Sequence, residues 1–180
     1  MLKNKLRNKI LVYRKNNYKF ASLKYYLLKD VLKKFKLLKN KKIGAYFPIN
    51  YEIDCLEVLK KFEKYGHKIS LPITRKKNQM DFFEWSLKDP LIIGKFGIPQ
   101  PISKKKIYPD ILFVPLVAFN KYKFRLGYGG GYYDRYIQKT KKIKKILTIG
   151  MAFSFQKVKS LPINEYDKKL DFILTEKYIK

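Results

Sequence analysis

The chain has 180 residues, a length that predicts one domain spanning residues 1–180. Hydrophobic residues make up 46% and charged residues 31%, a balance that excludes a disordered chain. No apolar run approaches the ~18 residues that a membrane-spanning helix requires, so we expect no membrane partner. Cys55 is the single cysteine and forms no internal disulfide. Residues 1–29 lack acidic residues but are rich in Lys rather than Arg and Ser, which argues against a targeting peptide and favours a cytoplasmic location.

The net charge of +28, from 42 basic and 14 acidic residues, has two interpretations. Counterion release would reward this charge in a nucleic-acid-binding protein. However, only five basic residues are arginines, the residue type suited to bidentate phosphate and base contacts. The lysines are spread along the chain and accompany many Asn, Ile and Tyr residues, as A/T-rich codons would produce. We therefore expect an incidental basic surface that favours anionic small substrates, and a basic nucleic-acid-binding protein is the alternative.

Apolar residues at helical spacing predict amphipathic helices in the first third of the chain. The first helix spans residues 2–15, and its predicted apolar face consists of Leu2, Leu6, Ile10 and Tyr13. The second spans about residues 20–38, and its predicted apolar face consists of Phe20, Leu23, Leu27, Val31 and Phe35. A third helix is predicted over residues 53–65. His67 follows it in a loop, where we expect a solvated surface side chain.

Short apolar runs predict strands at residues 42–48, 68–72, 109–115, 147–153 and 171–174. Residues 111–114 are apolar at every position, which indicates a sheet covered on both faces. Residues 79–101 mix aromatic residues with Gly and Pro and are predicted as a hairpin or an ordered loop. A further helix is expected over residues 132–139. The alternation predicts an α/β fold in which helices flank both faces of a mostly parallel central sheet, in a single layered domain.

The most informative segment is RLGYGGGYYDR, residues 125–135, in which four of five consecutive positions are glycine. Such a backbone can adopt positive φ, and its N–H groups can form a concavity that binds anions. The next helix would point its N-terminus at the same place. Arg125 could bond phosphate oxygens, and Asp134, in the first helical turn, could hold Mg²⁺. The segment is neither a P-loop nor a dinucleotide fingerprint, and a purely structural glycine turn is the alternative.

This segment, together with residues 109–120, resembles the signature of the 5-formyltetrahydrofolate cyclo-ligases, also called methenyltetrahydrofolate synthetases. The resemblance extends in order over nearly the whole chain. Its other parts are Lys3 with Arg7, AYFPINYE at residues 45–52, MDFFEW at residues 80–85, GIPQP at residues 97–101, and residues 150–171. It implies ATP- and Mg²⁺-dependent conversion of 5-formyltetrahydrofolate to 5,10-methenyltetrahydrofolate, ADP and phosphate. In that reaction ATP phosphorylates the formyl oxygen, and N10 then closes the ring.

The resemblance also implies roles for individual residues. The implied ATP-binding residues are Lys3, Arg7, Arg125, Leu126, Gly127, Tyr128, Gly129, Gly130, Gly131, Tyr132 and Tyr133, with Arg125 also catalytic. The implied folate-binding residues are Phe47, Glu52, Tyr128, Gly129, Gly130, Gly131 and Tyr132. Asp134 and Asp167 are the implied magnesium ligands. The Glu52 carboxylate could accept paired hydrogen bonds from the amino-pyrimidine edge of a pterin.

Some alternatives remain open on the residues alone. Lys3 and Arg7 share their i, i+4 spacing with Lys5 and Lys9, so both pairs could belong to a solvated basic face. Glu52 could be an ordinary acid near a helix N-terminus.

Two aromatic residues and two departures from the family pattern are also open. Phe47 and Trp85 are candidates for packing against the substrate rings or for the core. Gly130 stands where many members carry Lys, and Tyr166 where members commonly carry His. The same fold could also act on another formylated substrate.

Overall fold

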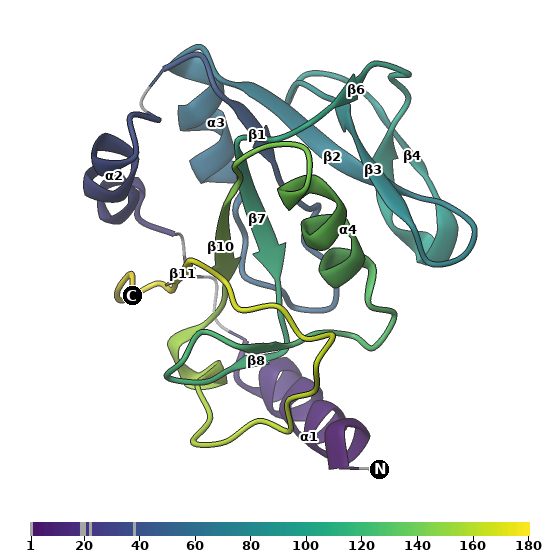
Figure 1. Cartoon of the computed structure of the whole chain (residues 1–180), viewed down its shortest axis with the longest axis vertical. Helices are drawn as coiled ribbons and strands as arrows, with labels where there is room; N and C mark the ends of the chain where they lie inside the picture. The colour runs from purple at the N-terminus through teal and green to yellow at the C-terminus, as the bar shows by residue number, and fades with distance from the viewer. Residues whose placement is uncertain (1, 19–20, 22, 38) are drawn as a thin grey trace.

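A computed structural model describes residues 2–18, 21, 23–37 and 39–180. Its centre is a seven-stranded sheet with the order β11-β10-β7-β1-β2-β3-β6 (Figure 1). The parallel strands are β1 (Lys42–Gly44), β2 (Lys68–Thr74), β7 (Ile111–Pro115), β10 (Leu147–Met151) and β11 (Phe172–Leu174). β3 (Met80–Glu84) and β6 (Lys106–Ile107) extend one edge in antiparallel pairing. The predicted mostly parallel sheet is confirmed.

Helices cover both faces of the sheet, as predicted. Side chains of a strand alternate between faces, and β7 shows this directly. Ile111 and Phe113 pack in one cluster with α2 (Tyr25–Lys34) and α3 (Leu56–Lys64), whereas Leu112 and Val114 pack in another with α4 (Tyr132–Lys141). Both pairs are fully buried. The uniformly apolar sequence of β7 therefore follows from its position between two covered faces.

Helix α1 (Leu2–Asn16) lies beyond the carboxyl ends of the strands rather than on the sheet (Figure 1). Its Ile10 packs with β8 (Ala118–Phe119), β9 (Arg125–Leu126) and Leu161. The helix is confirmed, and Leu6 and Ile10 of its predicted apolar face pack against the protein, whereas Leu2 and Tyr13 are exposed. The face turned toward the protein carries residues 3, 6, 7, 10, 11 and 14. Basic side chains on that face find oxygen partners, which the apolar pattern alone does not reveal.

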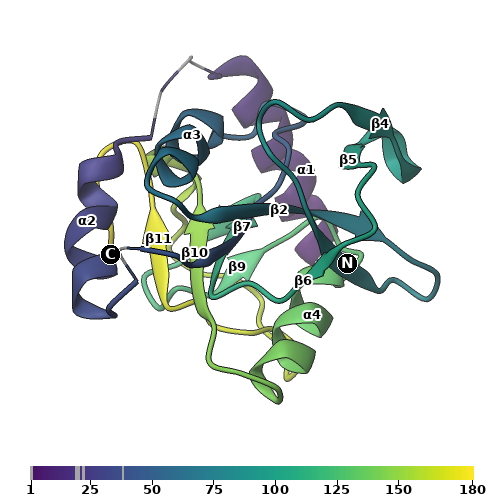
Figure 2. The ribbon, with the colours of Figure 1, turned by 90° about the horizontal axis from the view of Figure 1, so that it is seen from above.

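The segment predicted as a hairpin or loop forms β4 (Leu91–Ile93) and β5 (Pro99–Pro101), paired antiparallel and joined by a 3₁₀ turn, Lys95–Gly97. This hairpin and α2 lie at opposite ends of the sheet (Figure 2). A second 3₁₀ turn, Ser154–Gln156, follows β10. Helix α2 begins at residue 25, later than expected; Phe20 and Leu38, at the predicted helix ends, lie outside the described residues.

The prediction for His67 also fails. His67 is buried, not solvated: its ring packs edge-on against Phe62, and its Nδ1 accepts a hydrogen bond from the Lys41 N–H at 3.3 Å. The turn after α3 places the His67 ring against Phe62 of that helix, and the sequence pattern does not show this contact. Among the described residues, no helix is both long and apolar enough to cross a bilayer.

Candidate active site

A cleft of about 730 Å³ opens beyond the carboxyl ends of β1 and β7, where open α/β sheets commonly bind ligands. Its walls come from α1, the segment after β1, the glycine segment before α4, and the turn at residues 164–167. The structure brings every residue of the sequence-based site together here. The cleft is lined by Lys3, Arg7, Phe47, Glu52, Arg125, Leu126, Gly127, Tyr128, Gly129, Gly130, Gly131, Tyr132, Tyr133, Asp134 and Asp167.

The glycine segment, residues 127–131, forms an open backbone cradle. Gly129 and Gly131 have φ of +104° and +64°, a region in which other residues are strained, and Gly131 is the N-cap of α4. Within the described part of the chain, the N–H groups of residues 127–131 have no hydrogen-bond acceptor. Unpaired N–H groups at a helix N-terminus suit the oxygens of a phosphate.

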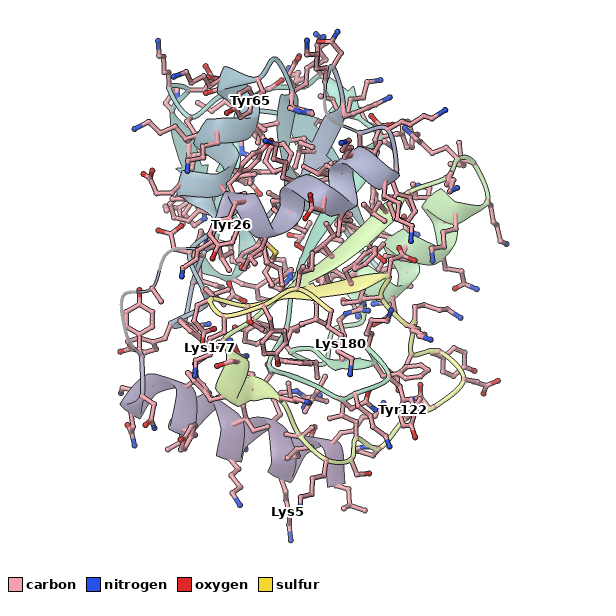
Figure 3. All side chains as sticks on the ribbon, turned by 90° about the vertical axis from the view of Figure 1, so that its left-hand side faces the viewer. Lys5, Tyr26, Tyr65, Tyr122, Lys177 and Lys180 are labelled. Carbon is pink, nitrogen blue, oxygen red and sulfur yellow. The ribbon has the colours of Figure 1, made fainter. Side chains whose placement is uncertain are left out.

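Two cations of α1 line the cleft, and one of them, Arg7, contacts the cradle. Arg7 Nε donates a hydrogen bond to the Gly127 carbonyl at 2.8 Å, and Lys3 Nζ forms an ion pair with Asp167 at 2.6 Å. In contrast, Lys5 and Lys9 are exposed, and Figure 3 shows Lys5 projecting into solvent. The i, i+4 spacing alone did not separate these pairs, but the direction of each side chain does.

Arg125 is buried and has two hydrogen-bond partners. Its side chain is only 4% exposed, and its Nη2 forms an ion pair with Asp134 at 2.8 Å, while Nη1 donates to the Lys168 carbonyl at 3.0 Å. Burial lowers the pKa of the Arg125 guanidinium, and the negative charge of Asp134 opposes this shift. Arg125 therefore fixes the position of Asp134 as well as lining the cleft.

The two predicted metal ligands lie at the same end of the cleft. The Lys168 N–H donates to Asp134 Oδ1 at 3.2 Å, which places the turn containing Asp167 against the first turn of α4. The residues that the structure describes include no group of three or more His, Cys, Asp or Glu side chains placed to hold a metal. Two carboxylates beside a phosphate cradle nevertheless fit Mg²⁺, which commonly uses one or two carboxylates, substrate phosphates and water.

The cleft also contains Glu52, which is 6% exposed. Its carboxylate accepts hydrogen bonds from the Ile49 N–H at 3.0 Å and from the Tyr128 hydroxyl at 2.9 Å. Burial raises the pKa of Glu52, and these two bonds and the charge of Arg14 oppose the rise. A buried carboxylate beside an open cleft is suited to pairing with donors on a ligand.

Phe47 and Trp85 differ in position. Phe47 lines the cleft and remains a candidate for contact with the substrate rings. Trp85 is 5% exposed in the main core, and its Nε1 donates to the Asp89 carbonyl at 3.2 Å. The alternative of core packing is therefore correct for Trp85.

Three residues that line the cleft could not be assigned to it from the local sequence. Thr74, Lys95 and Phe96 approach the cleft from the β2–β3 and β4–β5 regions, and only the tertiary fold brings them there. Arg14 is another residue that was missed, and a signal was available. It lies seven residues after Arg7, close to two helical turns, and therefore on the same face of α1 as Lys3 and Arg7.

A model of the 5-formyltetrahydrofolate cyclo-ligase family matches residues 2–176. The chain belongs to this family. A cyclo-ligase of the family from Haemophilus influenzae is 33% identical over 141 residues, which cover 74% of this chain and 75% of the relative. The expectation of an enzyme of this family is confirmed.

Two solved structures of cyclo-ligase relatives share the fold. The 5,10-methenyltetrahydrofolate synthetase of Aquifex aeolicus superposes with a TM-score of 0.76 and 30% identity, covering 100% of this chain and 92% of the relative. The synthetase of Mycoplasma pneumoniae superposes with a TM-score of 0.71 and 26% identity, covering 98% and 99%. Both cover almost the whole chain, so the segments that line the cleft lie within the shared fold.

Proposed function

We propose that this enzyme converts 5-formyltetrahydrofolate and MgATP to 5,10-methenyltetrahydrofolate, ADP and phosphate. The observation that carries the proposal is the pairing of two unlike subsites in one cleft. One end offers unpaired N–H groups with Lys3 and Arg7, and the other offers the buried carboxylate of Glu52. The first suits a polyphosphate and the second suits a pterin with its amino-pyrimidine donors.

The chemistry divides into two steps in which all atoms balance. The oxygen of an N-formyl group is a poor leaving group. The γ-phosphoryl group of ATP is therefore transferred to this oxygen, and ADP leaves. N10 then attacks the formyl carbon and loses its proton to solvent, the bond from carbon to the phosphorylated oxygen breaks, and inorganic phosphate departs as the ring closes. Phosphoryl transfer of this kind depends on positioning and charge neutralisation more than on covalent chemistry.

The residues of the cleft match these needs. The glycine cradle with Lys3 and Arg7 would bind and orient the phosphates, and Arg125 would hold Asp134 in place. Asp134 and Asp167 would hold Mg²⁺, which neutralises charge on the phosphate oxygens when it is bound. Glu52 would fix the pterin ring, and Phe47 would pack beside it. The role of each residue rests on this geometry and on the family resemblance.

The test is the growth of methenyltetrahydrofolate absorbance on mixing the protein with 5-formyltetrahydrofolate, ATP and Mg²⁺. Omitting ATP or Mg²⁺ should abolish product formation, and ADP and phosphate should appear in equal amounts. Other formamides supplied at the same concentration test whether the folate is the substrate. Absence of product with all three components present, from a protein that is folded by circular dichroism, would refute the proposal.

A further inference from the structure

Arg14 is buried in a way that its position does not require. It lies in the last turn of α1, between exposed Tyr13 and Lys15, yet it is only 1% exposed. A buried guanidinium needs acceptors from its surroundings. Arg14 finds them on three separate segments of the chain, and all three border the cleft or end in it.

The first partner lies in the segment that carries Glu52. Arg14 Nη2 donates to the Asn50 carbonyl at 2.7 Å. Asn50 and Tyr51 have φ of +49° and +61°, although neither is glycine, so the backbone bends sharply just before Glu52. A bond to this carbonyl stabilises the bend that aims Glu52 into the cleft.

The second partner lies in the glycine segment. Arg14 Nη2 also donates to the Tyr128 hydroxyl at 2.5 Å, and that hydroxyl donates to Glu52 at 2.9 Å. The rest of Tyr128 is open to the cleft, with 41% of the residue exposed. Arg14, Tyr128 and Glu52 therefore form a hydrogen-bonded chain that ends at the cleft. The third partner, the Leu116 carbonyl at 3.3 Å, ties the guanidinium to the segment that follows β7.

Resting on the proposed function, we propose that Arg14 is a positioning residue for folate, which orients Glu52 through Tyr128 and the Asn50 carbonyl and keeps the carboxylate ready for the pterin. Glu52 also faces Tyr46, Cys55 and Tyr133, whose pKa values are raised by burial, so these groups are neutral near pH 7. The charge of Arg14 favours the ionised form of Glu52. Loss of Arg14 removes that charge, so Glu52 ionises only at higher pH.

The test uses steady-state kinetics of the full chain with 5-formyltetrahydrofolate and MgATP from about pH 4 to about pH 9, a range that includes the ordinary glutamate pKa and values above it. Arg14→Met should raise the KM for folate by about tenfold or more and leave the KM for ATP within about twofold. The acid limb of kcat/KM for folate should move up by about one pH unit. Lys15→Met is the matched control, since it removes an exposed charge from the same turn of α1.

Two further variants separate positioning from a structural role. Arg14→Lys keeps the charge but not the planar fork, so it should restore the acid limb and only partly restore the KM for folate. Tyr128→Phe leaves Arg14 in place and removes the bridging hydroxyl, so it should also raise the KM for folate selectively. If Arg14→Met fails to fold, these two variants decide the matter.

A lower melting temperature with unchanged folate KM and pH profile in these variants overturns the inference and makes Arg14 a structural residue. Equal changes in the KM values of folate and ATP overturn it as well. Failure of the wild-type chain to form product refutes the proposed function instead, so the two failures are distinguishable.

Discussion

Replacing either predicted magnesium ligand, Asp134 or Asp167, with asparagine should lower activity to a similar extent. The two variants should differ in the free energy of unfolding. Asp134→Asn removes the counter-ion of Arg125, whose side chain is 4% exposed, whereas Asp134 itself is 27% exposed. Breaking a fully buried ion pair costs about 3–5 kcal/mol, and breaking an exposed pair costs at most about 1 kcal/mol. This half-buried pair falls between them, so we expect a loss of about 2 kcal/mol and a fall in melting temperature of about 4–8 °C.

Asp167→Asn is the matched comparison. Its partner Lys3 is 29% exposed, and Asp167 is 21% exposed, so both partners are hydrated in the absence of the ion pair. The expected loss is below about 1 kcal/mol. Both variants should lose about a hundredfold or more in kcat, because each lacks one carboxylate for Mg²⁺. Thermal melting and the product assay check the two parts separately. Equal melting temperatures would refute the argument from burial, and full activity in either variant would remove that carboxylate from the metal site.

Three more predictions address the cradle, the core and pH. Gly129→Ala should raise the KM for ATP by about tenfold, because at φ +104° an alanine is strained by about 1–3 kcal/mol and moves the cradle; an unchanged KM would contradict this. Gly150→Ala should lower the free energy of unfolding by about 2 kcal/mol in urea titrations, because its methyl group would lie 2.7 Å from Ile173 Cδ1; a loss below about 0.5 kcal/mol would show that the core adapts. Burial raises the pKa of Asp110, but hydrogen bonds from Lys144 and from a backbone N–H lower it by more. The net pKa of Asp110 is therefore below its ordinary value. That stabilisation is present above the unfolded pKa of about 3.9 and lost as pH falls through the folded pKa, so melting curves of wild type and Asp110→Asn should converge on acidification.

The sequence predicted the fold well wherever one periodicity governed a segment. β7 is apolar at every position because both faces of the sheet are covered, so its placement followed from composition alone. α4 begins directly after Gly131, as the glycine run indicated. The antiparallel edge strands β3 and β6 were not predicted as such, because their pairing depends on contacts that no local pattern records.

The site residues proposed from the sequence line one cleft, but their internal pairing could not be predicted. The ion pair of Arg125 with Asp134 crosses from a strand to the first turn of a helix, and the sequence gives no spacing rule for such a geometry. Arg14 was missed because apolar periodicity treats basic residues as outward-facing. His67 was misjudged for a related reason: its buried ring nitrogen accepts a hydrogen bond from a backbone N–H, and nothing in the local sequence signals that partner.

Helix α1 contacts the segments around the cleft at two points along its length. Lys3, which pairs with Asp167, and Arg14, which bonds the Tyr128 hydroxyl, are eleven residues apart in one continuous helix, a rise of about 16 Å. Since a helix is stiff along its axis, the distance between these two anchoring points of the helix is set by residue count rather than by loop flexibility. An insertion of a single alanine between Arg7 and Arg14 would turn the second anchor by about 100° and leave the first in place.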